Sequence, residues 1–178
     1  MKILNKTLTV GGNNKKDPVK IEVKTSYRIT IMVNNNDVMV GTHAGMLLIS
    51  PKGFEIFDPN GSFYYPEIAE GRLRLFPIYE PQKRADVYRS YLEYQLADGG
   101  EVYIYTFYLS KDEFLKIEDR ILNEEGCSGI LSCSRCTSNA ITGIGVFKNL
   151  PPDIFLPSKL KKELDKITNP IKILRNKP

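Results

Sequence analysis

The chain has 178 residues and a formal net charge of +4, with 42% hydrophobic and 26% charged residues. These values are typical of one ordinary globular domain and exclude a wholly disordered, collagen-like or coiled-coil chain. The longest apolar runs, residues 46–49 and 102–105, are far shorter than the roughly 20 residues that a membrane helix needs. Since the N-terminus also lacks an apolar signal segment, we expect a protein made in the cytoplasm without a signal peptide and without a membrane span.

Short alternating segments predict strands in the first part of the chain. Residues 2–10 alternate weakly, and residues 19–33 alternate again as two strands or one bent strand. The loop between them, residues 11–18, is rich in Gly, Asn and Asp-Pro, which favour turns. A second turn is expected over residues 34–37.

Residues 38–50 and the segment FEIFDPNG (54–61) flank a Ser-Pro-Lys-Gly turn and predict a β-hairpin. The expected register pairs Ile49 with Phe54, Leu47 with Ile56 and Gly45 with Asp58. Because strand side chains alternate between the two faces of a sheet, His43 and Asp58 then share one face, and Glu55 points to the other. A slip of one residue would reverse this arrangement.

Three amphipathic segments predict helices over residues 84–97, 111–124 and 158–167, and the β-rich run 102–109 predicts a strand after the first of them. The second helix is preceded by Ser110, and Glu113 follows three residues later, which is the pattern of a capping box. A further short helix is expected from about residue 132 to residue 142, where glycines end it.

The three cysteines are the most informative residues, because they lie within ten residues of one another in a chain with a single histidine, His43. Cys133 lies in the first turn of the expected short helix, where the helix dipole favours a thiolate. Cys136 lies one turn further along the same face, and Cys127 lies in the preceding loop. In a catalytic arrangement His43 would be the general base, and Asp58 would orient its imidazole.

Other interpretations of these residues stay open. A cysteine on an apolar helix face is usually a small core residue, and a lone histidine is more often structural than catalytic. The spacing C-x5-C-x2-C together with His43 also allows a zinc site of three thiolates and one imidazole, although the spacing is irregular for such a site. An odd number of cysteines makes no complete disulfide framework.

Positive charge is concentrated at the C-terminus. Residues 157–178 contain seven Lys or Arg residues and two acidic residues, a balance of +5 that leaves the rest of the chain at −1. Such a segment is usually a solvated helix face followed by a frayed end, and no aromatic residues are interleaved with its charges. We therefore expect no nucleic-acid partner, and a basic tail over residues 171–178.

The order of five short motifs resembles that of a known enzyme family. The motifs are THAG (42–45), FDPNGSF (57–63), DGGEVYIYTFYLSKDE (98–113), GCSGILSCSRCTSNAITGIGVFKNL (126–150) and PSKLKKELDKI (157–167). In this order they resemble the circularly permuted branch of the NlpC-type papain-like hydrolases, in which the histidine strand precedes the nucleophile helix. More narrowly, the chain resembles small proteins that are encoded with bacterial type VI secretion genes and are regarded as cell-wall-degrading effectors.

The resemblance assigns a catalytic role to each matching position. His43 matches the family histidine of the HAG motif, and Asp58 matches the acidic residue of the Asp-Pro-x-Gly turn. Cys133 matches the nucleophile because it stands ten residues before the GIG motif. Cys136 is the alternative nucleophile, because the Thr-Ser that follows it resembles the Cys-Thr-Thr of another permuted subgroup. Cys133 is preferred, since a nucleophile at Cys136 would leave barely two helical turns before Gly143. The Ser-Arg pair between the two cysteines departs from the family pattern.

The resemblance also implies a fold. It is an α+β fold of the permuted papain-like type, with a central antiparallel sheet and the nucleophile-bearing helix packed against it. We accordingly expect one catalytic domain over residues 1–170, with N-terminal strands and a loop over 1–37 and the papain-like core over 38–167, followed by the basic tail over 171–178.

The implied activity is cysteine-dependent hydrolysis of an amide bond in peptidoglycan peptides, without a cofactor or a bound metal. An antibacterial effector of this kind would be made in the bacterial cytoplasm and delivered to the periplasm of a target cell. Its partners would be an immunity protein and a spike or tube protein of the secretion machine. Two alternatives remain: an acyltransferase or thioesterase on the same permuted fold, and a non-catalytic binding or adaptor domain with inert thiols.

Overall fold

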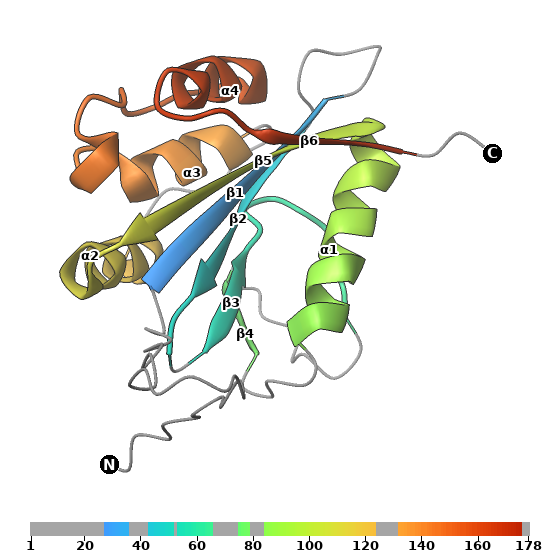
Figure 1. Ribbon diagram of the computed structural model, residues 1–178, viewed down its shortest axis with the longest axis horizontal. Coiled ribbons are helices and arrows are strands. Elements are labelled where there is room, and N and C mark those ends of the chain that lie inside the picture. The colour runs from blue at the N-terminus through green and yellow to red at the C-terminus, as the bar shows by residue number, and fades with distance from the viewer. Residues whose placement is uncertain are drawn as a thin grey trace, which may run out of the picture.

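A computed structural model describes residues 27–35, 43–51, 53–65, 75–78, 84–123 and 132–175. In this part of the chain six strands form one antiparallel sheet with the order β4-β3-β2-β1-β5-β6 (Figure 1). The strands are β1 (Tyr27–Asn35), β2 (Ala44–Ile49), β3 (Phe54–Phe57), β4 (Leu75–Ile78), β5 (Glu101–Leu109) and β6 (Ile171–Leu174). The strand expected over 2–10, the loop over 11–18 and residues 19–26 lie outside the described residues.

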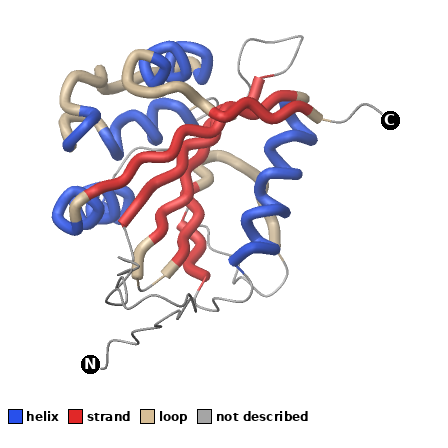
Figure 2. The backbone as a smooth tube through the Cα atoms, in the orientation of Figure 1, coloured by secondary structure: helices blue, strands red, loops and turns tan. Residues whose placement is uncertain are grey.

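Helices cover both faces of the sheet (Figure 2). One face carries α1 (Arg84–Gly99), and the other carries α2 (Lys111–Asn123), α3 (Cys133–Ile141) and α4 (Pro157–Asp165). The expected α+β class, with an antiparallel sheet and helices packed against it, is therefore confirmed, and each of these helices begins and ends within two residues of its expected bounds. No helix in the described ranges is long and apolar enough to cross a membrane.

The predicted hairpin register is confirmed. Leu47 pairs with Ile56 and Ile49 with Phe54, as the turn chemistry indicated. Leu47, Phe54 and Ile56 belong to the apolar cluster under α1, whereas Met46, Leu48 and Phe57 belong to the cluster under the three other helices. Both faces of the hairpin are buried, and the alternation decides which side chains reach each helix layer.

The central strand β1 follows the same alternation but buries polar side chains on one face. Ile29, Ile31 and Val33 pack in the cluster under α2, α3 and α4. The opposite face carries Met32 together with Thr30 and Asn34, and the Asn34 side chain is completely buried. A buried amide is costly unless it is hydrogen-bonded, so the α1 side of the sheet needs a polar network as well as an apolar core.

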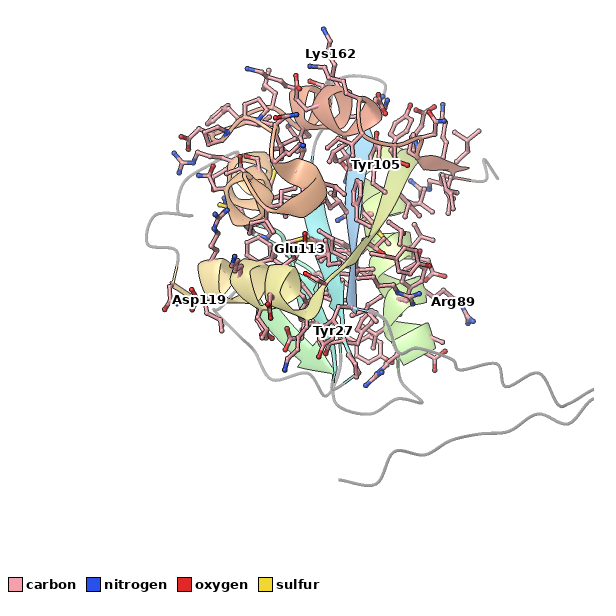
Figure 3. All side chains as sticks on the ribbon, turned by 60° about the vertical axis from the view of Figure 1, so that its left-hand side comes forward. Tyr27, Arg89, Tyr105, Glu113, Asp119 and Lys162 are labelled. Atoms are coloured by element: carbon pink, nitrogen blue, oxygen red, sulfur yellow. The ribbon has the colours of Figure 1, made fainter. Side chains whose placement is uncertain are left out.

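Local hydrogen bonds fix the ends of two helices. The Ser110 backbone N–H donates to Glu113 Oε2 (2.7 Å), and the Glu113 backbone N–H donates to Ser110 Oγ (3.3 Å), which confirms the capping box at the start of α2. Tyr105 on β5 lies beside α4 (Figure 3), and its hydroxyl donates to Asp165 Oδ1 (2.7 Å) at the end of that helix.

The expectation of a free basic tail from residue 171 is wrong for its first four residues. They form the edge strand β6, which pairs with β5. Lys172 Nζ lies 2.7 Å from Glu101 Oε1 and near the face of the Tyr103 ring, so a charge assigned to a frayed end is held on the sheet. The composition correctly predicted that these residues are exposed to solvent. It did not predict a strand, although apolar and charged residues alternate in the sequence Ile-Lys-Ile.

Glu55 lies on β3 and points toward the face that carries α2, as the hairpin register predicted. Its Oε2 atom is buried and has no hydrogen-bond partner among the described residues. Burial, followed by the charge of the nearby Glu118 on α2, raises the pKa of Glu55 to about 7. The folded state therefore favours the protonated carboxyl of Glu55. The stability that this preference provides is complete below about pH 4.5 and is lost as the pH rises through 7.

Replacement of Glu55 by glutamine should prevent the decrease in stability that ionisation of this carboxyl causes at high pH. We expect Glu55→Gln to raise the melting temperature by a few degrees at pH 8 and to leave it nearly unchanged at pH 4, because only the ionised carboxylate is unfavourable. Thermal unfolding of parent and variant across this pH range measures the difference. Glu93→Gln, on the exposed side of α1, is the control, and a Glu55→Gln difference that does not vary with pH would contradict the assignment.

Candidate active site

The three residues expected to form a catalytic site come together at one end of the sheet. His43 directly precedes β2, Asp58 directly follows β3, and Cys133 is the first residue of α3. Because β2 and β3 are antiparallel neighbours, the start of one lies beside the end of the other. α3 packs against β2 from the opposite face to α1, so the thiol and the carboxylate reach His43 from different helix layers.

Asp58 holds the imidazole through a short hydrogen bond. His43 Nε2 lies 2.7 Å from Asp58 Oδ1, and the two side chains are almost fully buried, with 6% and 3% of the residue surface exposed. The backbone N–H of Phe63 donates to the other carboxylate oxygen, Oδ2, at 3.3 Å. Since Nε2 is engaged by Asp58, Nδ1 is the nitrogen left for the thiol.

The thiol of Cys133 is the partner of that imidazole. Burial by itself raises the pKa of Cys133, but the hydrogen bond and charge of His43, followed by the backbone amide of Ala44, outweigh burial and lower the pKa below its ordinary value. Burial likewise lowers the pKa of His43, but the hydrogen bonds and charges of Asp58 and Cys133 outweigh it and raise the pKa to about 10. Both shifts favour a thiolate–imidazolium pair at neutral pH.

The alternative nucleophile, Cys136, is not available. Its sulfur is part of a disulfide bond, so it holds no proton to lose and forms no thiolate. Cys133 is the free cysteine of the described residues, and Cys127 lies outside them. The zinc alternative needs Cys136 as a thiolate ligand, which a disulfide-bonded sulfur does not provide. Cys136 lies on the buried face of α3 and packs in the apolar cluster between this helix and the sheet.

The acidic turn is tied directly to the start of the nucleophile helix. Residues 58–61 form a β-turn in which the Gly61 N–H donates to the Asp58 carbonyl (3.1 Å), with Pro59 at the second position and Asn60 at a positive φ of 57°. This backbone turns the Asn60 side chain toward α3, where its amide donates to the hydroxyl of Ser132. The residue next to the nucleophile is thereby linked to the turn that supplies the acid.

Sequence reasoning missed a set of polar residues that surround Asp58. The hydroxyl of Tyr91 donates to Asp58 Oδ1 at 2.8 Å, and the side-chain amide of Gln95 donates to Tyr91 at 2.9 Å. Asn34 on β1 continues the network to Gln95. The spacing of four residues between Val87, Tyr91 and Gln95 was the one signal in the sequence, since it places the glutamine on the same face of the helix as a valine and a tyrosine.

Aromatic rings close the α1 side of the site. The Tyr94 ring lies edge-on to the His43 ring, with 6.3 Å between centroids, and its hydroxyl accepts a hydrogen bond from the Ser62 N–H at 2.9 Å. Phe63 packs between Tyr91 and Tyr94, with centroid distances of 4.9 and 5.5 Å. The rings exclude water from the His43–Asp58 hydrogen bond, which strengthens it.

Comparison of the chain with protein-family models, with curated proteins and with solved structures found no match.

Proposed function

We propose that this protein is a cysteine-dependent amide hydrolase in which Cys133 is the nucleophile, His43 the general base and acid, and Asp58 the group that orients His43. One observation carries the proposal: the only histidine of the chain is held at Nε2 by the buried carboxylate of Asp58, and its hydrogen bond and charge lower the pKa of the free Cys133 thiol. A nucleophile, its base and an orienting acid in this order are the elements of a catalytic triad.

The proposed reaction begins with a thiolate. Cys133 attacks the carbonyl carbon of the amide, an S–C bond forms, and negative charge moves to the carbonyl oxygen. The first backbone N–H groups of α3 have no acceptor within the helix, and that of Cys133 donates to this oxygen. The His43 imidazolium then gives its proton to the leaving nitrogen as the C–N bond breaks, which leaves a thioester.

Water completes the cycle. Neutral His43 takes a proton from the water molecule as its oxygen attacks the thioester carbonyl, the C–S bond breaks, and the acid product leaves. The imidazolium and the thiolate are restored together. Asp58 keeps the ring aligned throughout, and no external oxidant, metal or cofactor enters the balance.

The substrate of the proposal is the peptide part of peptidoglycan, and it comes from the motif resemblance, as do the immunity protein and the secretion spike or tube protein as partners. One feature of the molecule supports action outside the cytoplasm. Disulfide bonds such as that of Cys136 persist in oxidising compartments and are rare in the reducing cytoplasm. Delivery to the periplasm of a target bacterium agrees with this chemistry.

Alkylation of Cys133 by iodoacetamide tests the proposed ion pair. An ordinary thiol with a pKa near 8.5 is less than about 1% thiolate at pH 6, whereas Cys133 should still react there because its thiolate is paired with His43. Peptide mapping by mass spectrometry identifies the labelled cysteine. The pH midpoint of the rate is the readout, since a thiol with 3% of its surface exposed reacts slowly at any pH. A midpoint at or above pH 8.5 would end the proposal.

The biological activity needs a separate test. The parent and Cys133→Ala are expressed in the periplasm of a bacterium, and lysis is followed together with the release of new peptide ends from purified cell wall. We expect lysis and new ends from the parent alone. Lysis without new ends would favour the acyltransferase or thioesterase alternative, and equal lysis by both proteins would exclude catalysis by Cys133 as its cause.

A further inference from the structure

We propose that the buried side chains of Asn34, Gln95 and Tyr91 form a positioning relay that holds Asp58, and through it His43, in the orientation that the thiol needs. The inference rests on the proposed function, because it explains how the base of that reaction is kept aligned. It adds three positioning residues from β1 and α1 to the three residues that carry the chemistry.

The relay is a closed circuit of hydrogen bonds that begins and ends on His43. The backbone N–H of His43 donates to Asn34 Oδ1 at 2.7 Å, and Asn34 Nδ2 donates to Gln95 Oε1 at 3.0 Å. Gln95 Nε2 donates to the Tyr91 hydroxyl at 2.9 Å, and that hydroxyl donates to Asp58 Oδ1 at 2.8 Å. The same Asp58 oxygen binds the imidazole of His43 at 2.7 Å. The backbone and the ring of one histidine are therefore fixed by the two ends of one network.

The four hydrogen bonds from the His43 backbone N–H to Asp58 all have the same direction. Each group donates to the next one, and the last acceptor is the carboxylate of Asp58, which in its ionised form only accepts. Burial, followed by the charge of Asp58, raises the pKa of Tyr91 well above its ordinary value, so the phenol keeps the proton that it donates. Hydrogen bonds that share one direction polarise one another and strengthen the chain.

Packing alone does not account for these residues. Asn34, Gln95 and Tyr91 are completely buried among Met32, Val87 and other apolar side chains under α1. Burying amides is unfavourable unless each group finds a partner, and apolar residues of similar size would fill the space without that cost. The relay is therefore best explained by what it orients.

Two glycines leave room for the hydrogen bond between Tyr91 and Asp58. A Cβ atom at Gly45 would lie 1.9 Å from the Tyr91 hydroxyl oxygen, and a Cβ atom at Gly61 would lie 1.7 Å from Asp58 Oδ2. Both distances are far below van der Waals contact, so a side chain at either position would displace the phenol or the carboxylate. The backbone on both sides of the Tyr91–Asp58 bond is thus shaped to admit it.

Tyr91→Phe tests the relay, because it removes one hydroxyl and keeps the ring. Nuclear magnetic resonance is unambiguous here, since the chain has a single histidine: the Nε2–H proton held by Asp58 gives one low-field imidazole signal. We expect Tyr91→Phe to speed the exchange of this proton with water and to lower the rate of Cys133 alkylation by iodoacetamide at pH 6 on the order of 10-fold. The charged or titratable groups around the His43 ring are Asp58, Cys133 from α3, and Tyr91 and Tyr94 from α1.

Tyr88→Phe is the matched control, since it removes a hydroxyl from the same helix outside the relay. Gln95→Met is a second variant that breaks the next link and keeps the length of the side chain, and it should give the same two changes as Tyr91→Phe. Parent-like exchange and alkylation in Tyr91→Phe and Gln95→Met would overturn the relay while the proposed function stands. A parent without the low-field signal and with an ordinary thiol midpoint would overturn the proposed function, and the relay with it.

Discussion

Replacement of His43 by alanine is expected to lower the rate at which Cys133 is acylated by about 10³–10⁴-fold at pH 7, as loss of the base does in other triads. In the parent the hydrogen bond and charge of His43 outweigh burial and keep the pKa of the thiol below its ordinary value. Without the imidazole, burial dominates, the pKa of Cys133 rises, and little thiolate remains. The measurement is the rate of p-nitrophenolate release from p-nitrophenyl acetate, in which the sulfur forms a thioester as the C–O bond breaks.

The pH profile separates loss of the base from loss of the fold. In His43→Ala the residual rate should rise tenfold per pH unit up to a midpoint above 8.5, whereas the parent should already be level near neutral pH. Added imidazole should restore part of the rate if the cavity left by the side chain is intact, and circular dichroism checks the fold. A His43→Ala variant with the rate and pH profile of the parent would mean that another group accepts the thiol proton.

The alternation of the sequence predicted the part of the site that depends on backbone geometry. Turn chemistry at residues 50–53 fixed the hairpin register, and the register placed His43 and Asp58 on one face at one end of the sheet. The short helix that begins at Cys133 followed from the pattern of small and apolar residues between flanking loops. The alternation of apolar residues and the type of turn are local properties of the sequence. They determine which face a strand side chain points to and which residues pair in a hairpin, before the tertiary structure is known.

The relay could not be predicted in the same way, because its members look unremarkable one by one. Tyr91 fits an apolar helix stripe. Asn34 begins a run of asparagines that predicted a turn over residues 34–37, and this was wrong for residues 34 and 35, because β1 extends through Asn35. Only the packing of α1 against β1 brings Gln95 to the Asn34 side chain.

The disulfide of Cys136 was missed for a similar reason, since an odd cysteine count does not indicate which thiol stays free.

A methyl group at position 45 should separate Tyr91 from Asp58. The Cβ of alanine would lie 1.9 Å from the Tyr91 hydroxyl oxygen and 3.2 Å from the Phe57 carbonyl oxygen, and the surroundings are buried. We expect Gly45→Ala to lower the free energy of unfolding by about 1–3 kcal/mol, the usual cost of overpacking, and to slow Cys133 acylation on the order of 10-fold. Gly53→Ala, in the same hairpin with open space around its Cβ, should change the unfolding free energy by less than about 0.5 kcal/mol.

A double-mutant cycle with Tyr91→Phe shows which atom the methyl group meets. In that background the hydroxyl is gone and the nearest ring atom, Cζ, lies 3.2 Å from the Cβ position, a contact that a small shift of the ring relieves. Gly45→Ala should therefore cost about 1 kcal/mol less in Tyr91→Phe than in the parent, measured by urea unfolding. An equal cost in both backgrounds would mean that the methyl group strains the Phe57 backbone instead. The glycine of the H-A-G motif would then have no connection with the phenol that holds Asp58.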